Sequence, residues 1–440
     1  MTAERYRLLG LARPRAAWFR DLSRWATSAA LPVEFVKCVA VDELAARLQS
    51  GRVFSAVVLD GGLSSLDRDL IELVREAGAA AVVIDDGHAR RDWTALGVDA
   101  VLPEPLDRGL LLGTLVAVAR PVARLDAEPG RLTAPLPAAW RGRLIAVTGP
   151  AGGGHSVLAM ALAQGLATTA RRSGMVALAD LALHADQALL HDVGDVVPGV
   201  QELVEAHRHG DPTNDEVRRL TFTLDDRGYQ LLLGLRRHRD WTVLRPRAVQ
   251  SSIDGLLRSF RLVVADIDVD VEGDEEVGSV DIEDRNVLAR TVASRADLVL
   301  VGAAPTLAGL RRLVVGLGDL RRLGVSPERL VPVITRAPRR GRLRADITRA
   351  VADLAVAIDP ELGRLGSPVF VPERRGLDEI LRAAAPLPRP LVQPVTAAVE
   401  AMLDEQPPRT LSATGFEPAA VMPGSLGARA DHGADQEADG

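Results

Sequence analysis

The strongest constraint on the fold is a glycine-rich turn that lies between a buried strand and a helix. The stretch RLIAVTG at 143–149 is a short apolar run and predicts a strand, whereas HSVLAMALAQGLATTARR at 155–172 has apolar residues at helical spacing. The order strand, glycine turn, helix is the context of a phosphate-binding loop, because backbone N–H groups and a helix N-terminus present partial positive charge there. The stretch therefore predicts an α/β fold with an anion-binding turn.

The turn itself, GPAGGGHS at 149–156, fits the phosphate-loop pattern G-x-x-x-x-G-K-[ST] at every position except one. His155 replaces the lysine that neutralises charge on the outer phosphates, while Ser156 keeps the hydroxyl that ligates magnesium. The alternative interpretation is a glycine-rich turn that serves only the tight packing of a strand against a helix. The predicted nucleotide-binding residues are Gly149, Gly152, Gly153, Gly154, His155 and Ser156.

Hydrophobic patterning divides the chain into two domains. Residues 1–120 alternate five apolar runs, RYRLLGL, EFVKCVAV, FSAVVLD, AAAVVID and DAVLPE, with helical patterns, which predicts a small flavodoxin-like, doubly wound domain of five βα units. Four prolines then predict a linker at 121–140. A second βα series fills 141–404, and its near-continuous apolar runs GMVALAD, RLVVADID, ADLVLVG and LVPVITR suit a mostly parallel sheet covered on both faces. Residues 405–440 are expected to form a disordered tail.

Composition narrows the class of protein. A single cysteine excludes internal disulfides and cysteine-rich metal sites. The absence of a long apolar run or a secretory pattern predicts a cytoplasmic location without direct membrane insertion. Because Lys37 is the only lysine, the second domain has no lysine to serve a phosphate, and the candidate substitute within the chain is an arginine such as Arg143 or Arg171. The histidines without metal-ligand spacing, expected at the surface, are His184, His191, His207 and His209.

From residue 141 to about residue 395 the chain resembles the MinD/ParA class of P-loop ATPases, and most closely the CpaE/TadZ-like branch, which includes septum-site-determining proteins. That class carries the loop K-G-G-x-G-K-[ST], whose first lysine reaches the partner's phosphates across a nucleotide-sandwich dimer. In this chain Pro150 stands at that lysine and His155 at the second. The resemblance implies a P-loop fold and ATP with Mg2+ as the ligands, with two charge contacts missing.

Three later stretches carry the same resemblance. VALADLALHAD matches the strand that ends in D-x-D, with Asp180 at the first position and Ala182 in place of the aspartate that orients the attacking water. FRLVVADID matches the Walker B strand, and the resemblance implies that Asp266 is positioned for a magnesium-bound water. LVPVITR ends at Thr335, where the family usually has an asparagine that touches the base. With Ser156, the two aspartates are the predicted Mg2+ site; an equal alternative is that they cap the turns after their strands.

The first domain resembles a response-regulator receiver domain, which the CpaE-like branch often carries ahead of its ATPase domain. Asp60, at the end of SAVVLD, stands at the phosphoacceptor position. The acidic pair after the first strand is absent, and Glu104 precedes Pro105 where receivers have a lysine. A carboxylate in place of an ammonium reverses the local electrostatics. The resemblance therefore implies a degenerate receiver-like domain that is not phosphorylated and that serves protein interaction.

The resemblance implies a cytoplasmic protein of spatial organisation, for septum-site determination or for positioning a pilus or secretion system, recruited to the pole or septum by partner proteins. A homodimer is implied as well. The missing residues predict that ATP is bound but poorly hydrolysed or not hydrolysed. Two alternatives stay open: an active ATPase switch completed by an arginine or a partner, and a partitioning ATPase that binds DNA nonspecifically through arginine-dense segments at 234–241 and 336–344.

Overall fold

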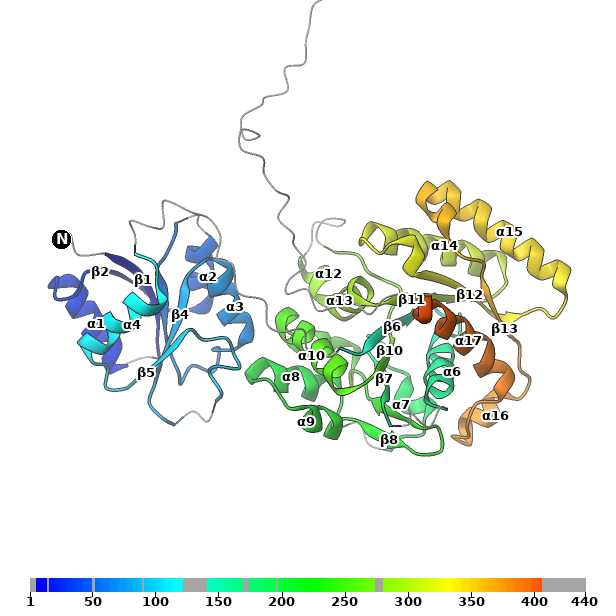
Figure 1. Ribbon diagram of the computed structural model, residues 1–440, viewed down its shortest axis with the longest axis horizontal. Coiled ribbons are helices and arrows are strands. Elements are labelled where there is room, and N and C mark those ends of the chain that lie inside the picture. Colours follow the sequence, from blue (N-terminus) through cyan, green and yellow to red (C-terminus); the bar gives the residue numbers. More distant parts are fainter. Residues whose placement is uncertain are drawn as a thin grey trace, which may run out of the picture.

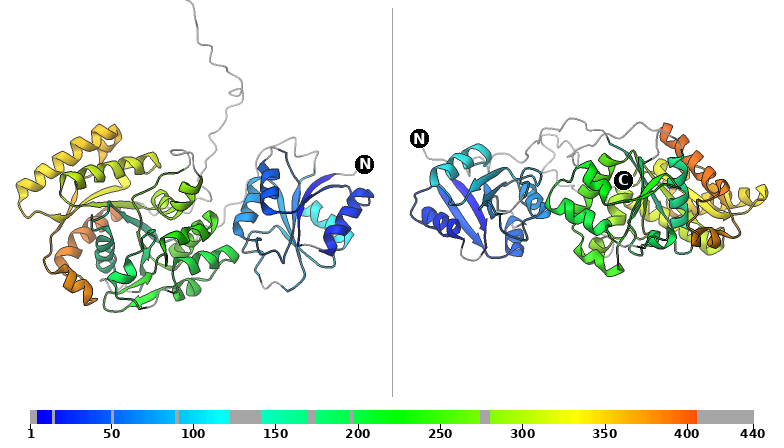
Figure 2. Two further views of the ribbon diagram at one scale, coloured as in Figure 1. Left: turned by 180° about the vertical axis from the view of Figure 1, so that it is seen from behind. Right: turned by 90° about the horizontal axis from the view of Figure 1, so that it is seen from below.

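Two α/β units, each built on one sheet, make up the computed structural model (Figure 1; Figure 2). The predicted linker lies outside the described residues except for Pro121, and the predicted tail lies outside them except for Glu405. The described residues are 5–13, 16–49, 52–88, 91–121, 141–168, 174–194, 197–273 and 280–405.

The first unit is a parallel sheet of five strands. The strands pair in the order β2-β1-β3-β4-β5, a crossover order found in doubly wound sheets. Helices α1 and α4 pack on one face through Trp18 and Leu111, and α2 and α3 pack on the other through Leu44 and Ile71. The elements are β1 (Tyr6–Leu11), α1 (Ala17–Thr27), β2 (Val33–Cys38), α2 (Val41–Gln49), β3 (Ala56–Asp60), α3 (Arg68–Glu76), β4 (Ala80–Asp85), β5 (Ala100–Pro103) and α4 (Arg108–Val118).

The expected helix between β4 and β5 is absent from the described residues 86–88 and 91–99, so the prediction of five βα units is wrong at this place. Two glycines with left-handed backbone, Gly87 (φ 76°) and Gly97 (φ 87°), favour turns here. The Trp93 indole packs in the cluster beneath α2 and α3: it is buried, and its Nε1–H donates to Asp85 Oδ2 at 2.9 Å. A turn anchored by one large aromatic side chain thus takes the place of the helix.

The second unit is an eight-stranded sheet in the order β13-β12-β11-β6-β10-β7-β9-β8, in which only the β8–β9 pair is antiparallel. The five longer strands coincide with the predicted apolar runs. The short outer strands β8, β9 and β13 were not predicted, because three or four residues carry little periodicity. The strands are β6 (Arg143–Thr148), β7 (Val176–Asp180), β8 (Phe222–Leu224), β9 (Tyr229–Leu232), β10 (Leu262–Asp266), β11 (Leu298–Ala303), β12 (Leu330–Ala337) and β13 (Val369–Pro372).

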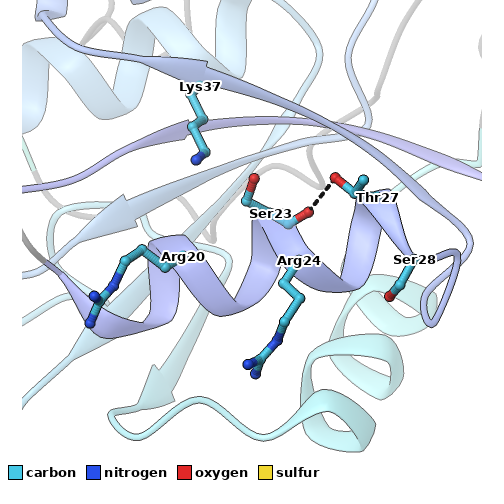
Figure 3. Close-up of a pocket in the computed structure, with 6 residues that line it drawn as sticks. All are labelled: Arg20, Ser23, Arg24, Thr27, Ser28 and Lys37. Atoms are coloured by element: carbon cyan, nitrogen blue, oxygen red, sulfur yellow. Dashed lines mark hydrogen bonds between the residues drawn. The ribbon is translucent and has the colours of Figure 1, made fainter.

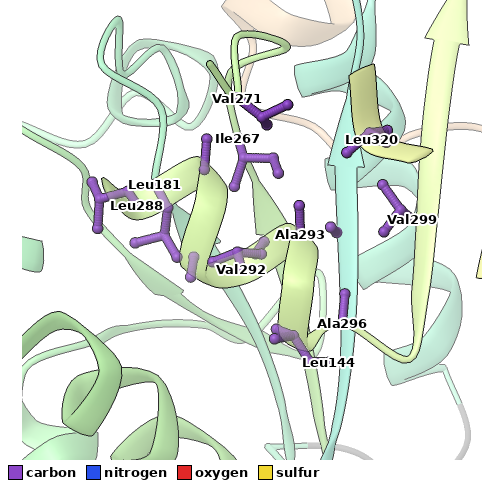
Figure 4. Close-up of a cluster of buried hydrophobic side chains, with 14 of the residues drawn as sticks. Leu144, Leu181, Ile267, Val271, Leu288, Val292, Ala293, Ala296, Val299 and Leu320 are labelled. Atoms are coloured by element: carbon purple, nitrogen blue, oxygen red, sulfur yellow. The ribbon is translucent and has the colours of Figure 1, made fainter. Parts of the chain in front are cut away.

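Helices cover both faces of this sheet, so its central strands are buried on both sides. On one face lie α6 (His155–Ala167) and α17 (Arg389–Glu405). On the other lie α8 (Val200–His209), α10 (Pro246–Ser259), α13 (Val287–Arg295), α14 (Leu307–Arg322) and α15 (Gly341–Ile358). Figure 4 shows part of this second layer, where Val292 and Ala293 of α13 belong to the same buried cluster as Leu144 and Val299 of the sheet. The remaining helices are α7 (Gln187–Leu190), α9 (Asn214–Arg219), α12 (Val280–Arg285), α16 (Leu377–Arg382) and three 3-10 turns, His238–Val243, Pro327–Arg329 and Pro360–Arg364.

Helix α3 of the first unit docks on α8 and α10 of the second (Figure 1). The Arg68 guanidinium donates to the carbonyl oxygens of His207 (3.0 Å) and Gly210 (2.9 Å), at the C-terminal end of α8. The neighbouring carboxylate, Asp69 Oδ1, accepts the backbone N–H of Arg247 at 3.0 Å, in the first turn of α10. A cation therefore meets the negative end of one helix and an anion the positive end of another, as the helix dipole favours.

The rest of this contact between the units is also polar. Arg208 Nε donates to Asp67 Oδ2 at 2.7 Å, and Arg247 pairs with Glu76. Each cluster of buried apolar side chains in the described residues belongs to one unit alone. The contact thus rests on charges and hydrogen bonds rather than on a shared core.

Candidate functional site

The glycine turn after β6 approaches β11 so closely that a side chain is excluded. A Cβ at Gly149 would lie 2.2 Å from the carbonyl oxygen of Gly302, which is backbone and cannot rotate away. Gly152 (φ 74°) and Gly154 (φ 79°) have left-handed backbone, and Gly154 is the residue that precedes the first turn of α6. The predicted strand, turn and helix are therefore present, and the turn runs to the N-terminus of a 13-residue helix.

Strand β12 supports this turn through two successive side chains. Thr335 Oγ1 donates to the Gly153 carbonyl oxygen at 2.6 Å, and Arg336 Nη2 donates to the Gly152 carbonyl oxygen. Thr335 is buried and Arg336 is exposed. The residue predicted to contact a base therefore lies directly against the turn.

A cavity of about 490 Å³ opens beside the turn, which is the size of a small-ligand pocket. Thr335, Arg336 and Gly154 line it together with apolar side chains of α6. Residues between Val371 and Glu379, at the end of β13 and the start of α16, line it as well. The end of β13 and the start of α16 thus line the same cavity as the predicted nucleotide-binding turn.

The two predicted magnesium aspartates are direct neighbours at the carboxyl edge of the sheet. Asp180 ends β7, Asp266 ends β10, and the two are paired in register. Both are fully buried. Gln187, at the start of α7, bridges them: its backbone N–H donates to Asp180 Oδ2 (2.9 Å), and its Nε2 donates to Asp266 Oδ2 (2.7 Å) and to the Ser156 carbonyl oxygen (3.0 Å). The start of α6 and both strand ends therefore meet at one buried amide.

Burial governs the charge of this pair. Loss of solvation, reinforced by the charge of Asp266, raises the pKa of Asp180 well above its usual value. Burial also raises the pKa of Asp266, against opposing effects of His155 and of hydrogen bonds from Gln187 and Ser156. Two adjacent carboxyl groups in such surroundings retain a proton more readily than either does alone.

The residues of the predicted Mg2+ site have the oxygen atoms that the ion prefers, but they are too few to hold it by themselves. One oxygen of each carboxylate, Asp180 Oδ1 and Asp266 Oδ1, has no hydrogen-bond partner, and oxygen is the donor that Mg2+ prefers. Within the described ranges, however, there is no group of three or more His, Cys, Asp or Glu that could hold a metal. The Gln187 amide already lies against Asp266. A Mg2+ ion here would have to arrive with a phosphate ligand.

Gln187 was not predicted from the sequence. Two buried side chains follow one another from its backbone. Its backbone carbonyl oxygen lies 2.7 Å from His191 Nδ1, and His191 Nε2 lies 2.6 Å from the Tyr229 hydroxyl. Burial lowers the pKa of His191 to about 4 and raises the pKa of Tyr229 to about 12, so both are neutral near pH 7. His191 and His207 are buried, so their expected place at the surface is wrong.

Arg143, which was considered as a substitute cation, does not lie at the turn. Arg143 lies at the start of β6, at the sheet edge opposite the turn, and its Nη1 pairs with Asp297 Oδ1 at 3.5 Å. Arg171 lies outside the described residues. Lys37 belongs to the first unit and lines a hollow of about 430 Å³ beside α1. Figure 3 shows that Arg20 and Arg24, which line it too, point away from Lys37, so the three cations do not converge.

In the first unit, Asp60 is buried at the end of β3 and forms an ion pair with Arg13. Arg13 Nε donates to Asp60 Oδ1 at 2.8 Å, and the Gly62 backbone N–H donates to the same oxygen at 2.9 Å. The other end of the guanidinium donates to Asp86 Oδ2 at 3.0 Å. Among the described residues no ion pair joins Glu104 to this group. The Asp60 carboxylate is therefore already paired with a cation.

We expect Arg13→Ala to lower the free energy of unfolding of the full chain by about 2 kcal/mol, because the buried Asp60 carboxylate loses its charge partner. The change Asp60→Asn removes that unpaired charge, so the double variant should recover most of the loss. Urea unfolding of the four proteins of this double-mutant cycle measures the coupling. Additive losses would contradict the pairing.

No model of a known protein family matches the chain. No curated protein matches it either.

Solved structures of ParA and MinD proteins are similar to part of the chain. They include a ParA family ATPase from Chlorobium tepidum TLS (16% identity, 59% of this chain and 98% of that one, TM-score 0.44). The MinC:MinD cell division complex of Aquifex aeolicus matches over 61% of this chain and 98% of that one, at 16% identity and a TM-score of 0.42. MinD from Pyrococcus horikoshii OT3, complexed with Mg-ADP, matches over 60% and 95%, at 16% identity and a TM-score of 0.42. Similarity at this level assigns the chain to no family.

Proposed function

We propose that the protein binds ATP or ADP at the glycine turn as a static ligand and uses it in spatial organisation of the MinD/ParA type, with little or no hydrolysis. The observation that carries the proposal is the cavity of about 490 Å³ whose wall joins Gly154, at the N-terminus of α6, to Thr335 and Arg336. Backbone N–H groups at the end of a glycine turn suit phosphates. The adjoining apolar and polar walls suit a base and a ribose.

The absence of turnover follows from the residues that would carry charge in phosphoryl transfer. Pro150 and His155 stand where the resembled class has lysines, and Ala182 stands where it has the water-orienting aspartate. Loss of one charge contact to the transferred group costs about three orders of magnitude in rate. The Gln187 amide against Asp266 adds a neutral group where a metal-bound water would be needed.

The cellular role rests on the sequence resemblance to the CpaE/TadZ-like branch. In that role the second unit is the core of a cytoplasmic scaffold, alone or as a homodimer, that partner proteins of the division, pilus or secretion machinery recruit to the pole or septum. The first unit, with Asp60 neutralised by Arg13, serves as a docking module rather than a phosphorylation switch. No described helix is long and apolar enough to span a membrane.

Titration calorimetry of the full chain with ATP and ADP, in Mg2+ and in EDTA, tests the proposal. We expect micromolar binding with little effect of Mg2+, because the described residues hold no group of three or more metal ligands and the Gln187 amide already lies against Asp266 Oδ2. We expect His155→Lys to strengthen binding about tenfold through a charge-assisted contact with the phosphates. No phosphate release should be detectable in the wild type. Absence of binding in the wild type together with binding in the lysine variant would show that the turn is a relic, and phosphate release would contradict the static role.

A further inference from the structure

The turn needs a cation, and the second unit contains no lysine to supply one. Lys37 lies in the first unit, and Arg143 is held by Asp297 at the far edge of the sheet. Arg336 differs from both because it already contacts the turn, at the Gly152 carbonyl oxygen. It also lines the cavity beside Gly154.

The backbone of β12 is distorted at this residue. Successive side chains of a regular strand point to opposite faces, so Thr335 and Arg336 should not reach the same loop. Both do so because the register of β12 against β13 shifts between Ile334 and Ala337. Bulges of this kind re-aim a side chain and are frequent next to functional sites.

Arg336 also has a left-handed backbone, with φ of 49°. For a residue with a Cβ this conformation costs about 1–2 kcal/mol, and glycine would adopt it without that cost. A long charged side chain at a position where the backbone favours glycine indicates that the side chain itself is used.

The charge of Arg336 is free to meet a ligand. Its hydrogen bond goes to a neutral carbonyl, the side chain is exposed, and in the described part of the chain it forms no ion pair. Several N–H groups of the guanidinium remain for other acceptors, and their planar arrangement suits a phosphate bound through two oxygens.

We propose that Arg336 replaces the missing loop lysine and binds the phosphates of a nucleotide in the cavity beside Gly154. This assignment rests on the proposed nucleotide binding and adds the residue that recognises the anionic part of the ligand. The base and ribose then occupy the wall formed by Val371 to Glu379.

The test is calorimetric titration of the full chain with ADP and with adenosine, which lacks phosphates. Arg336→Asn removes the charge with a residue that tolerates left-handed backbone, and Arg336→Lys keeps the charge. Arg339→Asn is the matched control, because it removes an exposed charge three residues away that does not line the cavity. We expect Arg336→Asn to weaken ADP binding about ten- to hundredfold and to leave adenosine binding unchanged. Arg336→Lys should retain most of the ADP affinity, and Arg339→Asn all of it.

The outcomes separate this assignment from the proposed function. If the wild type binds ADP and Arg336→Asn binds it equally well, the assignment is wrong and nucleotide binding stands. If Arg336→Asn loses ADP and adenosine to the same extent, the residue only shapes the cavity, and the assignment is again wrong. If the wild type binds neither ligand, both proposals fall.

Discussion

Replacing Gly149 by alanine should lower the free energy of unfolding by more than about 3 kcal/mol and abolish nucleotide binding. The added Cβ would lie 2.2 Å from the Gly302 carbonyl oxygen and 3.1 Å from its carbonyl carbon. Both atoms belong to the backbone of β11, which is held in the middle of the sheet by β6 and β12. Relief of the clash therefore requires β6 and β11 to separate at the point where the turn begins. Urea unfolding monitored by circular dichroism measures the loss, and calorimetry measures the binding.

Gly152→Ala is the matched control for this change. Gly152 lies in the same turn and has φ of 74°, but no heavy atom lies within 4 Å of its added Cβ. Only the left-handed backbone is then unfavourable for alanine, which costs about 1 kcal/mol. Equal destabilisation by the two changes would contradict the close approach of Gly149 to β11.

Asp180→Asn should stabilise the protein at pH 8 by about 2 kcal/mol and have almost no effect near pH 4. In the native state, burial and the neighbouring charge of Asp266 raise the pKa of Asp180 above its ordinary value of 3.8. The native state therefore keeps a proton that the unfolded chain releases, so the unfolding free energy falls as the pH rises through the native pKa. Asparagine carries no charge and still offers an oxygen to the Gln187 N–H, so the variant should lose this pH dependence.

Denaturant unfolding at a series of pH values measures this difference, with Asp297→Asn as the control. Asp297 is also buried at a sheet edge, but its Oδ2 accepts the Leu144 N–H at 2.8 Å and its Oδ1 pairs with Arg143. Its replacement should destabilise the protein at pH 8, because the Arg143 guanidinium loses this carboxylate partner. A pH slope that persists in Asp180→Asn would show that the pair with Asp266 is not its source.

Most of the fold follows from patterns that local sequence encodes. The central strands β6, β7, β10, β11 and β12 are continuous apolar runs, and their burial on both faces is the physical reason for that composition. The segment after β4 shows the limit of this reasoning. A single buried Trp93 replaces a helix there, and one aromatic side chain leaves no periodic trace.

The candidate site was predictable where backbone shape dictates the residue type, and not where side chains meet across the fold. The glycines of the turn fall into the first class, and the two aspartates were placed by their position at the ends of apolar strands. Gln187 and Arg336 fall into the second: Gln187 matters because of where α7 begins, and Arg336 because of a bulge in β12. No local sequence pattern predicts the start of α7 or the bulge in β12.

The contact between the two units has a consequence for how they respond to ionic strength. Arg68 and Asp69, adjacent in one turn of α3, each meet the oppositely charged end of a different helix, and no apolar cluster crosses the boundary. Added salt screens contacts of this kind and leaves apolar packing intact. The units can therefore separate without exposing a core, and each should behave as its own cooperative unit in unfolding. Added salt should therefore weaken the hold of the first unit on the second.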